Sequence, residues 1–299
     1  MELLMKFFDE LNELDKLIID DKENLTKKLI RMKERGMREL QTIIDFDRTL
    51  ASYKKVDGKL NSTSFGVFES DPYFNEEFRD QLCSLTKKYR PIEIDPNMDE
   101  EKKTKHMVDW WVISQEIMTK SKISKSSVQE TVNNSDLVLR SKVKEYFEKF
   151  NNSNRPILIF SAGLADIIQS IIEKFKLNFD CVHVFGNFME FDENGIICGF
   201  REPLIHVFNK MLDSIPDSGR YNSAKSTILV GDSLGDIHMH HGSHKFCNQA
   251  DASDVIRIGF LNGNSNHYLD EYKKNYDIVL INDESFIVPN KIVDFICNH

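Results

Sequence analysis

Short apolar runs alternate with amphipathic stretches along the chain from about residue 41 onward. Apolar runs bounded by turn residues predict buried strands, and apolar residues spaced by three and four positions predict helices. Strands that alternate with helices form a parallel sheet covered on both faces, so the pattern predicts an α/β fold with a Rossmann-like parallel sheet. The predicted strands cover residues 41–45, 156–160, 182–185, 226–231, 255–260 and 277–281.

The first two predicted strands are separated by about 110 residues, far more than a helical crossover needs. This stretch therefore holds an inserted module, and we expect a helical cap over the carboxyl edge of the sheet, where it can exclude water and select the substrate. Helical periodicity covers residues 76–89, 100–118 and 126–150, and residues 188–200 predict a β-hairpin at the sheet edge. The predicted domains are a catalytic core of residues 1–51 and 143–299 and a cap of residues 52–142.

The first 18 residues carry apolar side chains at helical spacing, with acidic residues between them. They predict an amphipathic helix that packs on the protein's own core. A helix on a membrane surface is the alternative, but its polar face would be rich in Lys and Arg. The acidic residues argue against a signal or transit peptide, and no stretch reaches the ~18 apolar residues that a membrane span needs. We expect a cytoplasmic protein that does not enter a membrane.

Composition narrows the range of partners. The 299 residues carry a formal net charge of −9, and an acidic surface argues against a nucleic-acid polymer, whose phosphates need basic patches. A small phosphorylated substrate stays open, because a local cation can neutralise one phosphate. The five cysteines are odd in number and form no CxxC pair, which is typical of reduced thiols in a cytosolic protein. We further expect a monomer.

Candidate chemistry is concentrated where the predicted strands end. Asp45 and Asp47 follow an apolar run, and their spacing of two places them near each other at the end of a buried strand. Open α/β sheets bind ligands at this edge, and paired carboxylates suit a Mg²⁺ ion and a phosphoryl group. The same topology can bring further groups to this edge: Ser161, Lys210, and Asp232 with Asp236.

Each of these groups also has a structural explanation of its own. Asp45 could end a strand at a turn, and Ser161 could cap the following helix. Lys210 could be a solvated lysine at the end of a helix. Asp232 and Asp236 could be an N-cap and a first-turn acid, both favourable at a helix start. Their occurrence together, in this order, favours one shared site.

In this order the groups resemble the four motifs of the haloacid dehalogenase superfamily: DxDxT, a Ser after the second strand, a Lys, and an acidic pair after a later strand. The resemblance extends to the cytosolic 5′-nucleotidase III (pyrimidine 5′-nucleotidase) family. It implies Mg²⁺-dependent hydrolysis of nucleoside 5′-monophosphates through an aspartyl-phosphate, with some phosphate transfer to a nucleoside. The segments that carry it are residues 45–50, 92–96, 159–163, 187–192, 205–210 and 231–233.

The resemblance also implies roles in catalysis. Asp45 is the nucleophile and, with Asp232, a Mg²⁺ ligand, and the backbone carbonyl of Asp47 is a further ligand. The Asp47 side chain protonates the leaving oxygen and then activates water, which needs a pKa not far from the working pH. Lys210 offsets the repulsion between anions. Asp236 anchors either the metal shell or Lys210.

The same resemblance implies a substrate site. Ser161 and Ser114 contact the phosphate, Glu93 reads the base or ribose, and Trp111 lines the base site. Trp111 and Ser114 are three positions apart on one predicted helix and so share a face. Phe65 could form the opposite wall of a base sandwich. A tryptophan face together with a carboxylate would suit the positive charge of a 7-methylguanine base.

Plainer interpretations exist for several of these residues. Glu93 lies in a strand-like or buried run, residues 92–94, and could pair with a lysine of the cap. Trp110 suits core packing, and Trp111 could do the same. Four histidines follow Asp236 and could hold a second metal, but they lack an obvious third ligand, so we expect an exposed polar helix. They are His238, His240, His241 and His244.

The sequence therefore predicts a 5′-nucleotidase with Mg²⁺ as cofactor and a small nucleoside monophosphate as substrate: CMP or UMP, with 7-methyl-GMP as a further candidate. Two alternatives stay open. The cap could select another phosphorylated metabolite, with the same chemistry in the core. The chain could also be a non-catalytic binder of a phosphorylated ligand, but such a protein would be expected to have lost Asp45, Asp47 or Lys210.

Overall fold

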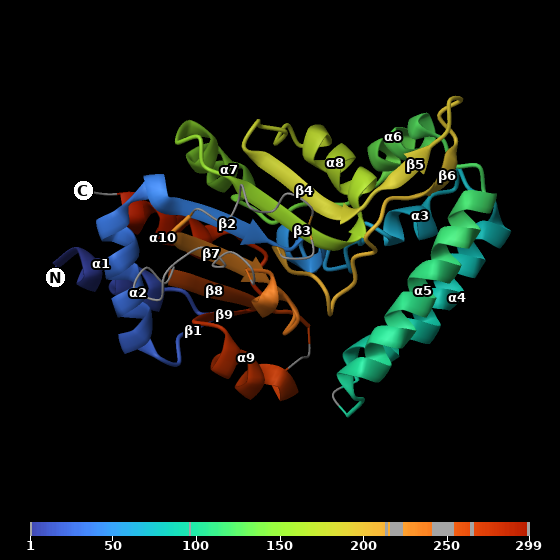
Figure 1. Cartoon of the computed structure of the whole chain (residues 1–299). Coiled ribbons are helices and arrows are strands. Elements are labelled where there is room, and N and C mark those ends of the chain that lie inside the picture. The colour runs from blue at the N-terminus through green and yellow to red at the C-terminus, as the bar shows by residue number, and fades with distance from the viewer. Residues whose placement is uncertain are drawn as a thin grey trace.

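A seven-stranded sheet forms the centre of the molecule, in the order β1-β9-β8-β7-β2-β3-β4 (Figure 1). The computed structural model describes residues 2–95, 97–212, 215, 224–240, 254–263 and 266–297. Every neighbouring pair in the sheet is parallel except β1 with β9, which confirms the predicted α/β fold. The strands are β1(Leu17–Ile18), β2(Leu40–Ile44), β3(Ile157–Leu164), β4(Val182–Asn187), β7(Ser226–Gly231), β8(Asp254–Leu261) and β9(Ile278–Ile281), with β5(Met189–Phe191) and β6(Ile197–Phe200) in a separate antiparallel pair.

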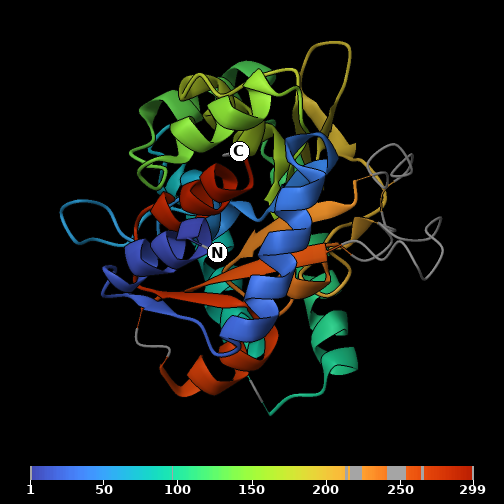
Figure 2. The same cartoon turned by 90° about the vertical axis from the view of Figure 1, so that its left-hand side faces the viewer.

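Apolar side chains on both faces of the sheet are buried because they alternate along each strand. Ile44 of β2 belongs to one cluster and its neighbour Ile43 to the other. The first cluster is completed by α1(Glu2–Asn12), α2(Lys22–Arg35), α7(Val143–Asn152), α8(Ala165–Lys174) and α10(Ile287–Cys297), together with apolar side chains of residues 67–132, and the second by α9(Leu269–Asn275). The first and last helices lie on the same side of the molecule (Figures 1 and 2). None of the helices over the described residues is both long and apolar enough to cross a lipid bilayer.

The order of the strands creates one special position at the edge of the sheet. The chain leaves β2 for β3 on one side and later returns to place β7 on the other side of β2. Ile44 at the end of β2 pairs with Val230 near the end of β7, so both strands finish together. In open α/β sheets, ligands bind outside the carboxyl ends of the strands at such a reversal of direction.

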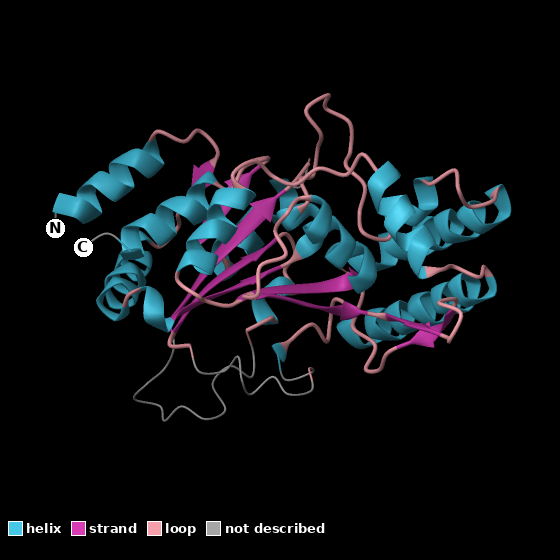
Figure 3. Ribbon diagram, turned by 90° about the horizontal axis from the view of Figure 1, so that it is seen from above, coloured by secondary structure: helices cyan, strands magenta, loops and turns pink. Residues whose placement is uncertain are grey.

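The segment between β2 and β3 carries four helices that lie beyond the carboxyl ends of the strands (Figures 1 and 3). They are α3(Gly66–Ser70), α4(Glu76–Ile94), α5(Glu100–Lys120) and α6(Lys125–Asn134). The two long helices each begin at a side-chain cap: the Asn75 side chain accepts from the Phe78 N–H at 2.9 Å, and that of Asp99 from the Glu101 N–H at 3.0 Å. Such caps satisfy N–H groups that the helix itself leaves unpaired.

The hairpin predicted over residues 188–200 exists, but the prediction that it lies at the edge of the large sheet is wrong. Strands β5 and β6 form their own two-stranded sheet rather than extending the edge of the large one. The Ile197 N–H donates to the Ile123 carbonyl at 2.8 Å, and the Lys125 N–H donates to the Gly195 carbonyl at 3.1 Å. Backbone groups of the inserted segment thus pair with the hairpin, which lies beside that segment (Figure 1).

Three other predicted elements differ in their bounds. The single helix expected over residues 126–150 is two helices, because α6 ends at Asn134 and the extended chain that follows pairs Leu139 with Ala51 before α7 begins. Residues 92–94 are the last turn of α4 and not a strand, since the helix continues through Pro91. The N-terminal helix ends at Asn12, and Leu17–Ile18 form β1.

Helix α1 packs on the core as predicted, and this can be tested with a pair of substitutions. Leu11 is fully buried, while Met5 on the same helix is 63% exposed. We expect Leu11→Ala to lower the free energy of unfolding by about 2–5 kcal/mol, because it leaves a cavity. Met5→Ala should change it by less than about 0.5 kcal/mol. Urea denaturation followed by circular dichroism measures both, and equal midpoints for the two variants would contradict this packing.

Candidate active site

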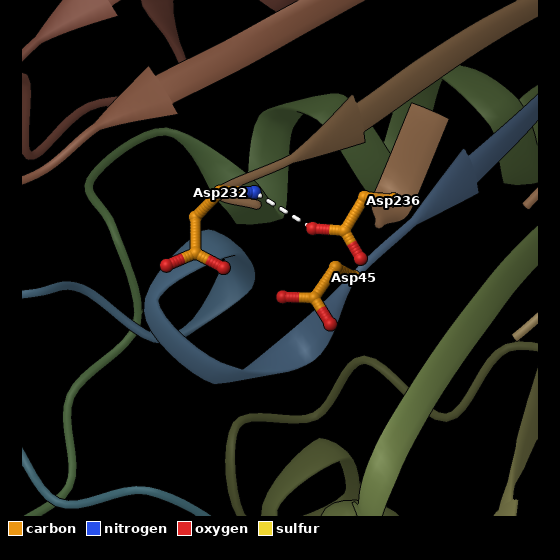
Figure 4. A group of neighbouring side chains, drawn as sticks. All are labelled: Asp45, Asp232 and Asp236. Atoms are coloured by element: carbon orange, nitrogen blue, oxygen red, sulfur yellow. Dashed lines mark hydrogen bonds between the residues drawn. The ribbon is translucent and has the colours of Figure 1, made fainter. Parts of the chain in front are cut away.

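Three aspartates meet at the carboxyl ends of β2 and β7. Asp45 directly follows β2, Asp232 directly follows β7, and Asp236 begins the next helical turn, residues 236–238. Each contributes a carboxylate oxygen to a group whose atoms all lie within 4.8 Å of one another (Figure 4). Among the residues that the structure describes, this is the only group of three side chains that could hold a metal ion.

Lys210 lies between two of these carboxylates. Its Nζ donates to Oδ1 of Asp45 and, at 2.7 Å, to Oδ1 of Asp236, and the residue is only 4% exposed. The solvated lysine considered above is therefore wrong. Asn187 at the end of β4 holds the start of this loop, because its side chain both donates to the Ile205 carbonyl and accepts from the Ile205 N–H.

The turn between Asp232 and Asp236 is packed too tightly for a side chain at position 231. Oδ2 of Asp236 accepts from the N–H groups of Asp232 at 3.0 Å and Ser233 at 2.9 Å. A Cβ atom on Gly231 would lie 2.4 Å from the Cβ of Asp236. Glycine is therefore required here for close approach, and Asp236 is held in place by backbone donors rather than by solvent.

Burial sets the protonation behaviour of the cluster. It raises the pKa of Asp45 well above the ordinary range, and Lys210 opposes this while the charges of Asp236 and Asp232 add to it. Burial and the charge of Asp236 raise the pKa of Asp232 to about 6. Burial alone would lower the pKa of Lys210, but Asp236 and Asp45 outweigh it and leave that pKa raised, so the ammonium stays charged.

These residues fit a Mg²⁺ ion. Oδ2 of Asp45 is buried and accepts no hydrogen bond from any part of the chain that the structure describes. A buried carboxylate oxygen without a partner is unfavourable, and a hard cation with oxygen ligands would satisfy it. Asp45 and Asp232 offer such oxygens, whereas Asp236 already uses its own on Lys210 and two N–H groups.

The carboxylate of Asp47 points to a different partner. Its Oδ1 accepts from the N–H of Ser64 and its Oδ2 from the hydroxyl of Ser64, each at 2.6 Å. Burial raises the pKa of Asp47, and these two hydrogen bonds oppose the shift. The predicted metal ligand at Asp47 is its backbone carbonyl, so its side chain does not need to bind the metal and can take part in proton transfer. Ser64 was not found from the sequence, since nothing in the spacing of residues 47 and 64 links them.

The loop after Asp47 is held by a buried arginine that sequence reasoning also missed. Arg48 has a positive φ of 63°, which turns the chain sharply. Arg140 donates to the carbonyls of Arg48 at 2.6 Å and Thr49 at 2.8 Å, and to Oδ1 of Asn262 at 3.0 Å. Nδ2 of Asn262 in turn lies 3.5 Å from Oδ2 of Asp232. Arg140 thus connects the loops that follow β2, β7 and β8.

Glu93, the predicted reader of base or ribose, is paired with Arg90 one helical turn earlier. The two side chains share a face only because residues 92–94 are helical, since a strand would point positions three apart to opposite faces. The Glu93 side chain is 12% exposed and that of Arg90 is 40% exposed. The hydroxyl of Tyr268 in the core donates to the Ile94 carbonyl at 2.9 Å, which attaches this end of α4 to the core.

Phe65 and Trp111 lie close together, but their rings are not parallel, so they do not form the two walls of the predicted base sandwich. Phe65 meets Trp111 edge to face, with ring centres 6.1 Å apart and planes at 83°. Trp110 stacks on Tyr89 of α4 at 5.8 Å, as expected for packing between helices. Ser114 is buried, and its hydroxyl donates to the Trp110 carbonyl at 2.8 Å.

The remaining predicted residues are Ser161 and the histidines. Ser161 is buried in the second half of β3, and its hydroxyl accepts from the Gly163 N–H at 2.9 Å. Nε2 of His240 lies 3.3 Å from Arg257. His241 and His244 lie outside the described residues. The aspartates, Lys210 and Ser161 therefore gather at one edge of the sheet, and Glu93, Trp111 and Phe65 belong to the inserted segment beyond it.

The fold defines a structural class, the haloacid dehalogenase-type fold. The fold resembles that of a haloacid dehalogenase (HAD) family hydrolase from Salmonella enterica serovar Typhi, with a TM-score of 0.54 and 14% identity over 86% of this chain and 72% of that one. Similarity at this level of identity concerns the fold alone.

Closer similarities fix the family. The model of the pyrimidine 5′-nucleotidase (UMPH-1) family matches residues 48–297, and the chain belongs to that family. It is 34% identical over 268 residues to the 7-methylguanosine phosphate-specific 5′-nucleotidase of Homo sapiens, covering 89% of this chain and 87% of the relative. The Gallus gallus protein of that name is 35% identical, with 89% and 90% covered. The structure of cytosolic 5′-nucleotidase IIIB bound to cytidine has a TM-score of 0.86 and 29% identity, with 95% and 94% covered.

The raised pKa of Asp232 predicts how binding of the expected Mg²⁺ ion would depend on pH. In the metal-free protein this carboxyl holds a proton below about pH 6 and is ionised above it, so Mg²⁺ must compete with a proton at low pH. Because a ligand that binds only the folded state stabilises it, we expect Mg²⁺ to raise the Tm more at about pH 7.5 than at about pH 5. Differential scanning fluorimetry measures this shift.

The matched variants for that experiment are Asp232→Asn and Asp180→Asn. Asp180 is exposed, so its variant should respond to Mg²⁺ as the wild-type protein does. Asp232→Asn should lose most of the Mg²⁺-induced shift at both pH values. A shift of the same size at both pH values in the wild-type protein, or one retained in Asp232→Asn, would contradict the assignment of Asp232 as a ligand.

Proposed function

We propose that this protein is a Mg²⁺-dependent phosphatase that hydrolyses nucleoside 5′-monophosphates, with Asp45 as the nucleophile. The observation that carries the proposal is the buried ammonium of Lys210, which contacts Asp45 and Asp236 beside Asp232. Such a cluster leaves one oxygen of Asp45 without a partner at the edge where α/β sheets bind ligands. Membership of the pyrimidine 5′-nucleotidase family supports the same reaction.

The metal would be held by Asp45 and Asp232 and by the backbone carbonyl of Asp47, with Asp236 supporting Lys210. When bound, Mg²⁺ supplies positive charge that offsets the charge on the phosphate oxygens. Lys210 adds a positive charge through its contact with Asp45. A carboxylate can then approach a phosphate that would otherwise repel it.

The reaction has two steps on this chain's own residues. An oxygen of Asp45 bonds to phosphorus while the bond from phosphorus to the 5′ oxygen breaks, and Asp47 gives its proton to that oxygen. The ionised Asp47 then takes a proton from water as the water oxygen bonds to phosphorus, and the bond to Asp45 breaks to release phosphate. Burial raises the pKa of Asp47, which suits a group that must donate a proton near neutral pH. A nucleoside in place of water would give phosphate transfer.

The inserted segment, residues 52–142, is proposed as the cap that reads the nucleoside. Ser161 would donate to a phosphate oxygen, and Ser114 would contact the phosphate. Glu93 would accept from the base or ribose, and Trp111 with Phe65 would contact the base. CMP and UMP are proposed first, and the cytidine in the structure of cytosolic 5′-nucleotidase IIIB supports a pyrimidine. 7-Methyl-GMP is kept as a candidate because the relatives are named for it.

The ion pair of Glu93 with Arg90 bears on the choice of base. A lone carboxylate would attract the positive charge of 7-methylguanine, but Arg90 offsets much of the charge of Glu93. Glu93 can still accept hydrogen bonds from a neutral base while Arg90 holds it in place. This pairing favours neutral pyrimidine bases over a cationic purine.

The proposed setting is the cytoplasm, with the protein as a monomer that acts on small molecules and neither on a nucleic-acid polymer nor at a membrane. The net charge of −9 disfavours a polyanionic partner. A structural relative described as cytosolic supports the location.

Phosphate release from a panel of mononucleotides tests the function. With Mg²⁺ we expect CMP and UMP to be hydrolysed. With EDTA the rate should fall at least about 100-fold, because the positive charge of the metal ion is lost and that of Lys210 alone remains. Asp45→Asn should lower kcat by about 10⁴-fold or more, since the amide cannot form the phosphoenzyme.

Other outcomes of the panel separate the alternatives. Hydrolysis that is unaffected by EDTA would contradict the metal assignment, and turnover retained in Asp45→Asn would contradict the nucleophile. Activity on another phosphorylated metabolite, with none on nucleotides, would favour a different phosphatase. Binding of CMP without any turnover would favour a non-catalytic protein.

A further inference from the structure

Ser64 belongs to the inserted segment and makes polar contacts with the catalytic loop. It is fully buried and lies two residues before α3. Its N–H and its hydroxyl each donate to a different oxygen of Asp47, both at 2.6 Å. A carboxylate held by one donor on each oxygen cannot rotate about its final bond without losing both hydrogen bonds.

Gly163 in β3 leaves room for the contact between Ser64 and Asp47, because glycine has no side chain. If Gly163 carried a Cβ atom, that atom would lie 2.1 Å from the hydroxyl oxygen of Ser64 and 3.0 Å from Oδ2 of Asp47. The close approach requires glycine at 163, at the end of β3. The hydroxyl of Ser64 therefore lies in a tightly packed space between β3 and the loop after β2. It is buried there and is not exposed at the surface.

We propose that Ser64 is a positioning residue that orients the carboxylate of Asp47 toward the reacting oxygens. The proposal rests on the function proposed above, in which Asp47 transfers protons to the 5′ oxygen and from water. General acid–base catalysis requires the donor and acceptor atoms to be within hydrogen-bond distance, so the orientation of this carboxylate governs the rate and not the binding of substrate.

The position of Ser64 also links proton transfer to the base site. The next residue, Phe65, meets the rings of Trp110 and Trp111 edge to face, with ring centres 6.4 Å and 6.1 Å apart. Two consecutive residues of the insert thus contact Asp47 on one side and the proposed base site on the other. The core therefore depends on the insert for the geometry of its acid–base group.

The first test is Ser64→Ala, with Ser70→Ala as the matched control. Ser70 lies in the same segment, is exposed, and donates only to backbone carbonyls of its own helix. With CMP and Mg²⁺ we expect Ser64→Ala to lower kcat about 10- to 100-fold with KM within about twofold of the wild-type value. Ser70→Ala should match the wild-type enzyme. The Tm increase on adding Mg²⁺ should be unchanged in both, because the three-aspartate group is untouched.

The second test is a double-mutant cycle with Gly163→Ala. In the wild-type background the added methyl group collides with the Ser64 hydroxyl and should lower kcat. In the Ser64→Ala background that hydroxyl is absent, so the same substitution should have a clearly smaller effect, and the two effects should not multiply. Independent effects would mean that the two side chains do not share this space beside Asp47.

The outcomes separate this proposal from the function on which it rests. A wild-type enzyme active on CMP whose Ser64→Ala variant keeps kcat within about twofold contradicts the role of Ser64 alone. Effects of Ser64→Ala and Gly163→Ala that simply multiply, or a loss of the Mg²⁺-induced Tm increase in Ser64→Ala, contradict it as well. A wild-type protein without activity on any mononucleotide contradicts the proposed function, and with it any positioning of Asp47 for that reaction.

Discussion

Three carboxylates held within 4.8 Å of one another in a buried corner repel each other strongly, and the corner is stable only where positive charge is placed among them. Lys210 supplies that charge, through contacts with Asp45 and Asp236. Arg48, Arg90 and Lys210 lower the pKa of Asp232, but burial and the charge of Asp236 outweigh them and leave that pKa raised to about 6. The proposed Mg²⁺ ion would supply further positive charge. The same charge imbalance therefore accounts for both metal binding and the approach of a phosphate.

Most of the structure around this corner serves to bring distant parts of the chain together. The sheet order places the ends of β2 and β7 side by side, and Asn187 anchors the loop that carries Lys210. Gly231 allows Asp236 to approach the backbone, and Arg140 ties the loop after Asp47 to Asn262. These contacts are buried or partly buried, and they hold the groups of the site in place, as electrostatic catalysis requires.

Sequence reasoning succeeded where local pattern and strand order decide the outcome. The apolar runs before Asp45 and Asp232 predicted parallel strands, and the position of a residue just after a strand fixes its place at the edge of the sheet. It failed where tertiary contacts decide. Residues 92–94 look like a strand but continue a helix through Pro91, and only this makes Arg90 a neighbour of Glu93. Ser64 could not be found, because its pairing with Asp47 depends on how the insert folds back.

The proposed function depends on a bond from Asp45 to phosphorus, and chemical trapping can detect that bond. Enzyme quenched during turnover of CMP is treated with borohydride, which reduces an aspartyl-phosphate to homoserine, and the peptides are identified by mass spectrometry. We expect homoserine at position 45, present only when substrate and Mg²⁺ are both supplied and absent from Asp45→Asn. An active enzyme in which Asp45 stays unmodified, or in which homoserine forms at another aspartate, would contradict the proposed bond from Asp45 to phosphorus.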